Sequence, residues 1–150
     1  MKRLKLLFLL SGLALLAASA TAAFGHTAHV AGSAATVTTK STKLGTILVT
    51  SSGKTIYLDT GDKSGHFACT GACAKAWPPL STSGKPKAAG KVKASMLGTI
   101  KNGKVTQVTY NGHPLYTYSG DTKRGDINSQ NLKLFGAKWY VVSVAGPPIR

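Results

Sequence analysis

The chain contains one short segment twice, and this repetition constrains the fold more than any other feature. The two copies are Tyr-Leu-Asp-Thr-Gly-Asp at 57–62 and Tyr-Thr-Tyr-Ser-Gly-Asp at 116–121. Each copy follows a Leu-Gly-Thr-Ile run and precedes a Phe and then a Trp. The sequence therefore predicts two repeat units, at 44–80 and 97–144, followed by a tail at 145–150.

Both units have the pattern of strands rather than helices. Their apolar runs are short, rich in Val, Ile, Thr and Tyr, and separated by turn residues. Asn111-Gly112 lies between two such runs and is a strong signal for a β-hairpin. The second unit is expected to form a three-stranded meander, with a last strand at 138–144. The fold should be all-β and antiparallel, each unit a small sheet and the two packed as one small domain.

The first residues, 1–22, have the features of a secretory signal peptide. Lys2, Arg3 and Lys5 form a basic start, and a short apolar run and several small residues follow. The apolar run is shorter than the roughly 20 residues that a spanning helix needs. No later stretch is long enough to span a membrane, and no cysteine lies near the cleavage region. We therefore expect a secreted, extracytoplasmic protein without a lipid anchor.

Two more segments are expected to lie outside the repeat units. Residues 23–43 are rich in Ala, Thr, Val, Gly and Ser, which predicts a flexible leader with one strand at 35–39. Residues 81–96 contain Gly, Pro and four lysines, which predicts a linker or exposed loop.

Basic residues far outnumber acidic ones. The chain has 19 Lys and Arg against four Asp, and it has no Glu. Scattered lysines form a solvated surface that attracts anionic envelope polymers or lipid headgroups, weakly and with a strong salt dependence. Nucleic acid is a poor candidate partner for a secreted chain.

The aspartates lie in or close to the two repeated segments. Asp62 and Asp121 end the two copies, where a short carboxylate can accept backbone N–H bonds and close a turn. Tyr57, Tyr116 and Tyr118 are expected to pack on a sheet face. This interpretation accounts for the repetition, because each unit needs the same turn.

A cation or ligand site is the alternative for the carboxylates. Asp59 and Asp126 have no counterpart in the other copy. Calcium requires six to eight oxygen ligands, whereas each copy supplies two carboxylates beside Lys or Arg. No catalytic constellation is legible, so we expect neither an enzyme nor a cofactor.

The two cysteines, Cys69 and Cys73, are expected to form a disulfide, which is the default for a secreted chain. The alternative is copper binding or thiol redox chemistry, because His66 lies three residues before the pair and soft thiolates with an imidazole suit Cu(I).

The aromatic residues that follow each copy are expected to form the core. They occupy matching places in the two units; an exposed row would instead indicate glycan binding. These residues are Phe67, Trp77, Phe135 and Trp139.

The second copy fits the pattern Tyr-x-(Phe/Trp/Tyr)-x-x-Asp at Tyr116, Tyr118 and Asp121, and the first fits the looser Tyr-x4-Asp. The chain also contains the motifs Cys-Thr-Gly-Ala-Cys at 69–73, Trp-Pro-Pro-Leu at 77–80 and Trp-Tyr-Val-Val at 139–142. With these motifs, the chain resembles a bacterial secreted repeat family known as predicted lipoproteins with the Tyr-x-(Phe/Trp/Tyr)-x-x-Asp motif. The resemblance implies a signal peptide, extracytoplasmic location and tandem repeats, but no established activity. Many members are lipoproteins, whereas this chain lacks the lipid-attachment cysteine.

The sequence thus predicts a secreted, non-enzymatic structural or interaction module associated with anionic envelope surfaces. The alternative is a copper-binding or thiol redox protein of the cell envelope that uses Cys69, Cys73 and His66.

Overall fold

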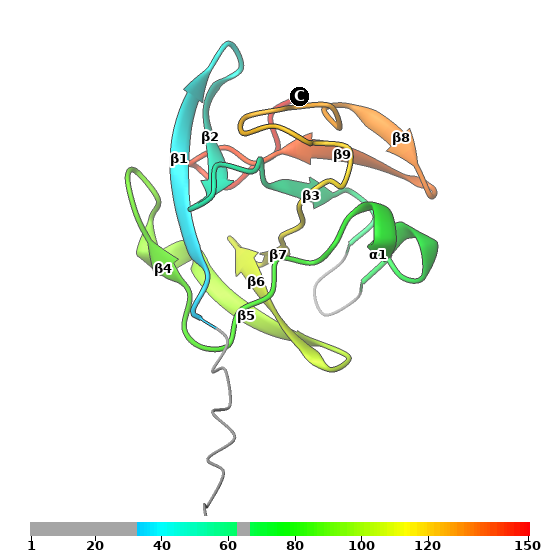
Figure 1. Ribbon diagram of the computed structural model, residues 1–150, viewed down its shortest axis with the longest axis horizontal. Coiled ribbons are helices and arrows are strands. Elements are labelled where there is room, and N and C mark those ends of the chain that lie inside the picture. The colour runs from blue at the N-terminus through cyan, green and yellow to red at the C-terminus, as the bar shows by residue number, and fades with distance from the viewer. Residues whose placement is uncertain (1–32, 63–66) are drawn as a thin grey trace, which may run out of the picture.

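The computed structural model describes residues 33–62 and 67–150, and most of its regular structure is strand (Figure 1). The pairings are antiparallel except between β1 and β4, so the all-β prediction is confirmed. The predicted signal peptide, the first part of the predicted leader and His66 lie outside the described residues. The elements are β1 (Thr36–Thr42), β2 (Gly45–Thr50), β3 (Tyr57–Asp59), α1 (Ala72–Ala76), β4 (Lys87–Ala88), η1 (Ala94–Met96), β5 (Leu97–Asn102), β6 (Val105–Tyr110), β7 (His113–Pro114), β8 (Leu132–Leu134) and β9 (Ala137–Val141).

The described strands are arranged in small sheets with the orders β2-β1-β4, β5-β6-β7 and β3-β9-β8. The predicted meander of the second unit is the sheet β5-β6-β7. Its last turn is Asn111-Gly112, where both residues have positive φ, 49° and 78°. Two consecutive left-handed residues match the twist of the flanking strands, which is why Asn-Gly is favoured there.

Strand β3 joins the two repeat units. It belongs to the first unit by sequence, but it pairs with β9 of the second, with Tyr57 opposite Val141 and Asp59 opposite Trp139. The chain after β9 also reaches β2, because the N–H of Leu48 donates to the carbonyl of Val142 over 2.9 Å. The prediction that each unit forms its own sheet is therefore wrong. All three residues of β3 are buried, so the strand needs backbone partners on both edges, and the other unit supplies them.

The two Leu-Gly-Thr-Ile runs do not occupy matching places. In the first unit the run, 44–47, leads from the hairpin turn into the second strand, β2. In the second unit the run, 97–100, lies in the first hairpin strand, β5. The hairpin β1–β2 of the first unit thus corresponds to the hairpin β5–β6 of the second, and the first unit begins at β1, before its Leu-Gly-Thr-Ile run.

Parts of the predicted leader and linker belong to the folded domain. Strand β1 extends past the expected 35–39, and its Val37 is fully buried. In the segment 81–96, the side chains of Thr82 and Val92 are buried, and β4 pairs with β1. These residues are therefore packed against the sheets rather than held apart from them.

Within residues 33–62 and 67–150, the core consists of two apolar clusters of buried side chains. One cluster is mainly aliphatic and lies among β1, β2, β6 and the chain around Leu115. The other is mainly aromatic and contains Trp77, Trp139 and the two motif tyrosines, Tyr57 and Tyr116. Both clusters draw residues from both repeat units, so neither unit has a complete core of its own.

We predict that neither repeat unit folds alone. Fragments 33–96 and 97–150, expressed separately, should lack a cooperative thermal transition, because each loses the strand partners and the core residues that the other supplies. Mixed in equal amounts, they should recover the near-ultraviolet circular dichroism of the intact protein. A cooperative transition in either isolated fragment would contradict the interlaced arrangement.

Candidate functional site

The two motif tyrosines meet backbone to backbone at the centre of the molecule. Tyr57 and Tyr116 form an antiparallel bridge. The N–H of Tyr57 donates to the carbonyl of Tyr116 over 2.9 Å, and the N–H of Tyr116 donates to the carbonyl of Tyr57 over 3.0 Å. The two copies of the segment thus exchange a reciprocal pair of backbone hydrogen bonds, as residues related by a local two-fold axis do.

The side chains continue this exchange, because each tyrosine reaches the aspartate of the other copy. The hydroxyl of Tyr57 donates to Oδ2 of Asp121 over 2.7 Å. The hydroxyl of Tyr116 donates to Oδ2 of Asp62 over 2.8 Å. A hydrogen bond to a carboxylate is roughly twice as strong as one between neutral groups. The motif spacing therefore serves contacts between copies rather than within one copy.

The remaining carboxylate oxygens tie down the loops that follow. Asp62 Oδ1 accepts the N–H of Ala68 over 2.8 Å, and Asp121 Oδ1 accepts the N–H of Asn128 over 3.0 Å. Each aspartate is preceded by the same turn: the N–H of Asp62 donates to the carbonyl of Asp59, and the N–H of Asp121 to that of Tyr118. Each carboxylate thus joins a turn, a loop and the opposite repeat.

Burial changes the titration of these groups. The pKa values of Asp62 and Asp121 lie above the ordinary value, chiefly because burial disfavours the charged form, although their hydrogen bonds act in the opposite direction. The pKa values of Tyr57 and Tyr116 are also raised, first by burial and then by the neighbouring carboxylates. The hydrogen bonds of the two aspartates stabilise the fold, whereas the burial of their carboxylates opposes it.

The two aspartates without counterparts differ in their surroundings. Asp59 is 3% exposed, and its Oδ1 accepts the N–H of Gly61 over 2.7 Å. Burial raises the pKa of Asp59. Asp126 lies in a loop, where its Oδ2 accepts the N–H of Lys123 over 2.9 Å. Asp59 stands where the second copy has Tyr118, so one unit has a carboxylate at the place of an aromatic ring.

Asp59 and Asp62 line a small cavity of about 180 Å³ together with His113 and Arg150. Among residues 33–62 and 67–150, no group of three or more His, Cys, Asp or Glu side chains is placed to hold a metal ion.

The aromatic side chains form a stack beside the two tyrosine–aspartate pairs, Tyr57–Asp121 and Tyr116–Asp62, which we call the crossed pairs. Trp77 and Trp139 are fully buried and stack with centroids 4.3 Å apart at an interplanar angle of 7°. Tyr118 stacks on the other side of Trp77 at 4.7 Å. The indole N–H of Trp77 donates to the hydroxyl of Ser129 over 2.8 Å, which again links the two units.

Phe135 departs from the predicted core. It is 54% exposed and has a positive φ of 54°, because it lies with Gly136 in the tight turn between β8 and β9. Its ring meets Trp77 edge to face with centroids 6.0 Å apart. The ring therefore covers the edge of the aromatic stack from outside. Phe67 is half-buried.

Cys69 and Cys73 are joined by a disulfide. Both are buried in the aromatic cluster, Cys73 within α1 and Cys69 shortly before it. Disulfide sulfurs lack the thiolate charge with which cysteine binds metal, and His66 lies outside the described residues. The described residues therefore give no support to the copper or thiol redox hypothesis.

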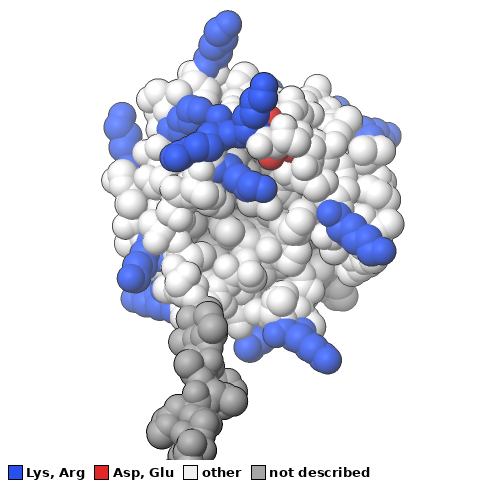
Figure 2. Space-filling model, viewed as in Figure 1, with Lys and Arg blue, Asp and Glu red and all other residues white. Residues whose placement is uncertain are grey.

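On the face seen in Figure 2, blue basic side chains are spread over the surface, and only a small acidic area is visible. They gather most densely over the end of the molecule that holds the β1–β2 hairpin and the loop before β8 (Figures 1 and 2). The carboxylates of Asp59 and Asp121 are buried, so they leave the surface to the cations.

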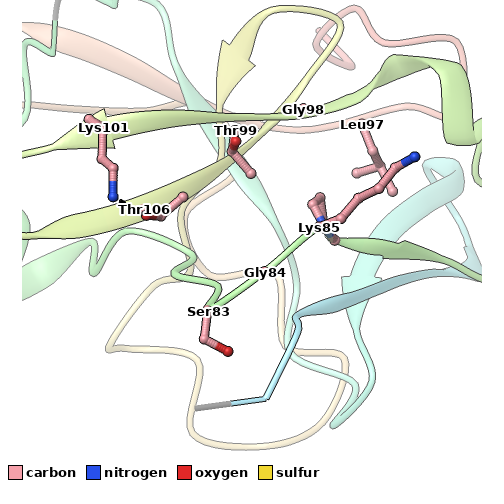
Figure 3. Close-up of a pocket in the computed structure, with 9 residues that line it drawn as sticks. Ser83, Gly84, Lys85, Leu97, Gly98, Thr99, Lys101 and Thr106 are labelled. Atoms are coloured by element: carbon pink, nitrogen blue, oxygen red, sulfur yellow. Dashed lines mark hydrogen bonds between the residues drawn. The ribbon is translucent and has the colours of Figure 1, made fainter. Parts of the chain in front are cut away.

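A second basic feature is a cavity of about 480 Å³ between β5, the start of β6 and the segment 83–86. Figure 3 shows Lys101 and Lys85 at opposite ends of this cavity, with hydroxyl side chains between them. The ammonium of Lys101 donates to the hydroxyl of Thr106 over 2.8 Å. The hydroxyl-bearing residues are Ser83, Thr99 and Thr106.

Comparison with known families decides the relationship. A family described as a secreted repeat of unknown function matches the chain twice, at residues 38–81 and 98–143, which together are more than half of its length. The chain belongs to this family. As a member of the secreted repeat family, it carries both repeats in one folded domain, and each match begins in the first strand of a hairpin, β1 or β5. The resemblance inferred from the motif is therefore confirmed.

No curated protein and no solved structure matches the chain. In the part that the structure describes, no helix is long and apolar enough to cross a membrane. The family description supports a secreted protein.

We predict that removing one hydroxyl of the crossed pairs destabilises the domain. Tyr57→Phe should lower the free energy of unfolding by about 1.5–3 kcal/mol, because Oδ2 of the buried Asp121 loses its donor while Oδ1 keeps the N–H of Asn128. Urea unfolding would measure this change. Tyr140→Phe is the matched control, because that hydroxyl donates to the neutral Asn131 and should contribute about 0.5–1.5 kcal/mol. Equal losses of unfolding free energy in the two variants would show that the Tyr57–Asp121 hydrogen bond contributes no more to stability than a bond to a neutral group.

We also predict that the domain becomes more stable in mild acid. The folded-state pKa values of Asp59, Asp62 and Asp121 are raised, so their contribution is complete below the unfolded value near 4 and is lost as the pH rises through the folded values. The free energy of unfolding should therefore increase from about pH 7 to about pH 4 at constant ionic strength.

Asp59→Asn tests the origin of this pH dependence. The amide oxygen can still accept the N–H of Gly61, but the buried charge is gone. The variant should show a weaker dependence of unfolding free energy on pH than the wild type, measured by urea unfolding. An unchanged dependence would show that Asp59 does not contribute to it.

Proposed function

We propose that this protein is a non-catalytic extracytoplasmic binding module whose ligands are anionic polymers of the cell envelope. The observation that carries the proposal is the division of charge between interior and surface. The chain has 19 cationic side chains and four carboxylates. Asp59, Asp62 and Asp121 make internal hydrogen bonds, and four carboxylates can offset only a small part of 19 positive charges.

The fold suits attachment rather than chemistry. Two crossed tyrosine–aspartate pairs, an aromatic stack and a disulfide make a rigid body from short strands. Lysines on β1, β5 and the loops project from that body. A fixed array of cations attracts a flexible polyanion through many weak contacts, and salt screens these contacts beyond about 8–10 Å.

The proposal predicts salt-dependent binding to anionic polymers. The protein should co-sediment with poly(glycerol phosphate) immobilised on beads at about 0.05 M salt, and raising the salt to about 0.5 M should reduce the bound fraction at least about tenfold. Beads carrying a neutral polysaccharide are the control and should retain little protein.

Vesicles of phosphatidylglycerol test the competing surface in the same assay. If the protein binds these vesicles but not the polymer at low salt, the proposal is wrong in its choice of partner. If it binds neither, the surface charge does not serve anion binding.

A further inference from the structure

A small cavity of about 210 Å³ lies where the first hairpin meets the loop before β8. Lys40 of β1 and Arg124 of the loop supply its cationic groups, and Gly53 of the turn after β2 also lines it. The cavity thus takes one cation from each repeat unit. Its volume corresponds to roughly seven water molecules at about 30 Å³ each, which is enough room for one phosphate group and some of its water. Hydroxyl-bearing side chains complete the lining: Thr38, Thr39, Thr50 and Ser51.

Two glycines make room for the two cationic side chains where the loop meets the turn. The N–H of Gly125 donates to the carbonyl of Gly53 over 2.9 Å, which ties the loop to the turn. A Cβ at Gly53 would lie 2.8 Å from Nε of Arg124, and a Cβ at Gly125 would collide with the ammonium of Lys40. The two glycines also have φ of 82° and 83°, where side chains are disfavoured. Each long side chain therefore lies across the glycine of the opposite repeat.

Neither cation has its charge matched by the protein in the described residues. The carboxylates of Asp59, Asp62, Asp121 and Asp126 make their hydrogen bonds elsewhere. In the β5 cavity, by contrast, the ammonium of Lys101 is already bonded to a hydroxyl. An ammonium and a guanidinium that line the same small cavity repel each other, and an oxyanion bound between them would reduce that repulsion.

We infer that this cavity is a phosphate-binding site, and that its natural ligand is one phosphodiester group of the anionic polymer; this inference rests on the proposed function. An ammonium, a planar guanidinium and hydroxyls offer donors from several directions, as a tetrahedral phosphate requires. The site would fix the register of a polymer that the rest of the surface holds only by diffuse attraction. We call it the Lys40–Arg124 site.

Inorganic phosphate tests the site directly. Titrated into the ¹⁵N-labelled protein, phosphate should shift the amide resonances of Gly53 and Gly125 in a saturable way, because these amides lie beneath the two cations. The double variant Lys40→Gln/Arg124→Gln should lose these shifts. The control Lys133→Gln/Lys138→Gln removes the same charge from the β8–β9 hairpin and should keep them. Shifts that persist in the first variant, or that vanish equally in both, would overturn the site.

Polymer binding separates the failure of the site from the failure of the proposed function. Lys40→Gln/Arg124→Gln should weaken binding of poly(glycerol phosphate) about tenfold, a loss expected for charge-assisted hydrogen bonds, while Lys133→Gln/Lys138→Gln weakens it only slightly. Binding of polyglutamate, which has carboxylates, should fall equally in the two variants. Equal losses with poly(glycerol phosphate) would overturn the site and leave the proposed function standing. Wild-type protein that ignores both polymers would overturn the proposed function, whatever phosphate does at Gly53 and Gly125.

Discussion

Tyr57 and Tyr116 exchange backbone hydrogen bonds across the centre of the molecule, and the hydroxyl of each reaches a carboxylate of the other repeat. The other elements are placed relative to this contact. It sets the two copies of the motif antiparallel, and it leaves the free edge of β3 to β9. Through the second oxygens of Asp62 and Asp121, it also fixes the loops that follow each copy. The repeated motif is thus the joint between the repeats.

The same contact explains the distribution of charge. Carboxylates are costly to bury, and each one in the joint requires hydrogen-bond donors to offset that cost. The chain uses three of its four acids there and at Asp59, while the lysines of the described residues remain outside the core. An unbalanced cationic surface is therefore a consequence of how the core is held together, and the Lys40–Arg124 site lies where that surface crosses from one repeat to the other.

The sequence predicted the features that depend on local chemistry. Short apolar runs rich in Val, Ile, Thr and Tyr indicated strands, and Asn111-Gly112 indicated a hairpin. A pair of cysteines in a secreted chain, Cys69 and Cys73, indicated a disulfide. Each of these features is determined by residues that lie close together in the sequence. The repeated Tyr-x4-Asp motif was also visible, and with it the family.

The remaining features depend on contacts between distant residues. Nothing local indicates that β3 pairs with β9, because strand pairing is decided by which edges remain open after the hairpins form. The partner of Tyr57 is Asp121, not the Asp62 of its own motif, and only the packed structure shows this exchange. Phe135 was expected in the core by analogy with Phe67, but the tight β8–β9 turn holds it at the surface.

The interlaced joint has a consequence for chains with one copy of this repeat. Such a chain has a tyrosine and an aspartate of its own, but in this structure each tyrosine donates to the aspartate of the other copy. A single copy therefore needs a second copy to form these hydrogen bonds. Two identical chains would satisfy both contacts at once around a true two-fold axis, in an isologous homodimer. The present protein then corresponds to that dimer with its subunits fused through the segment 81–96. Fusion makes the pairing independent of concentration, which suits a secreted protein.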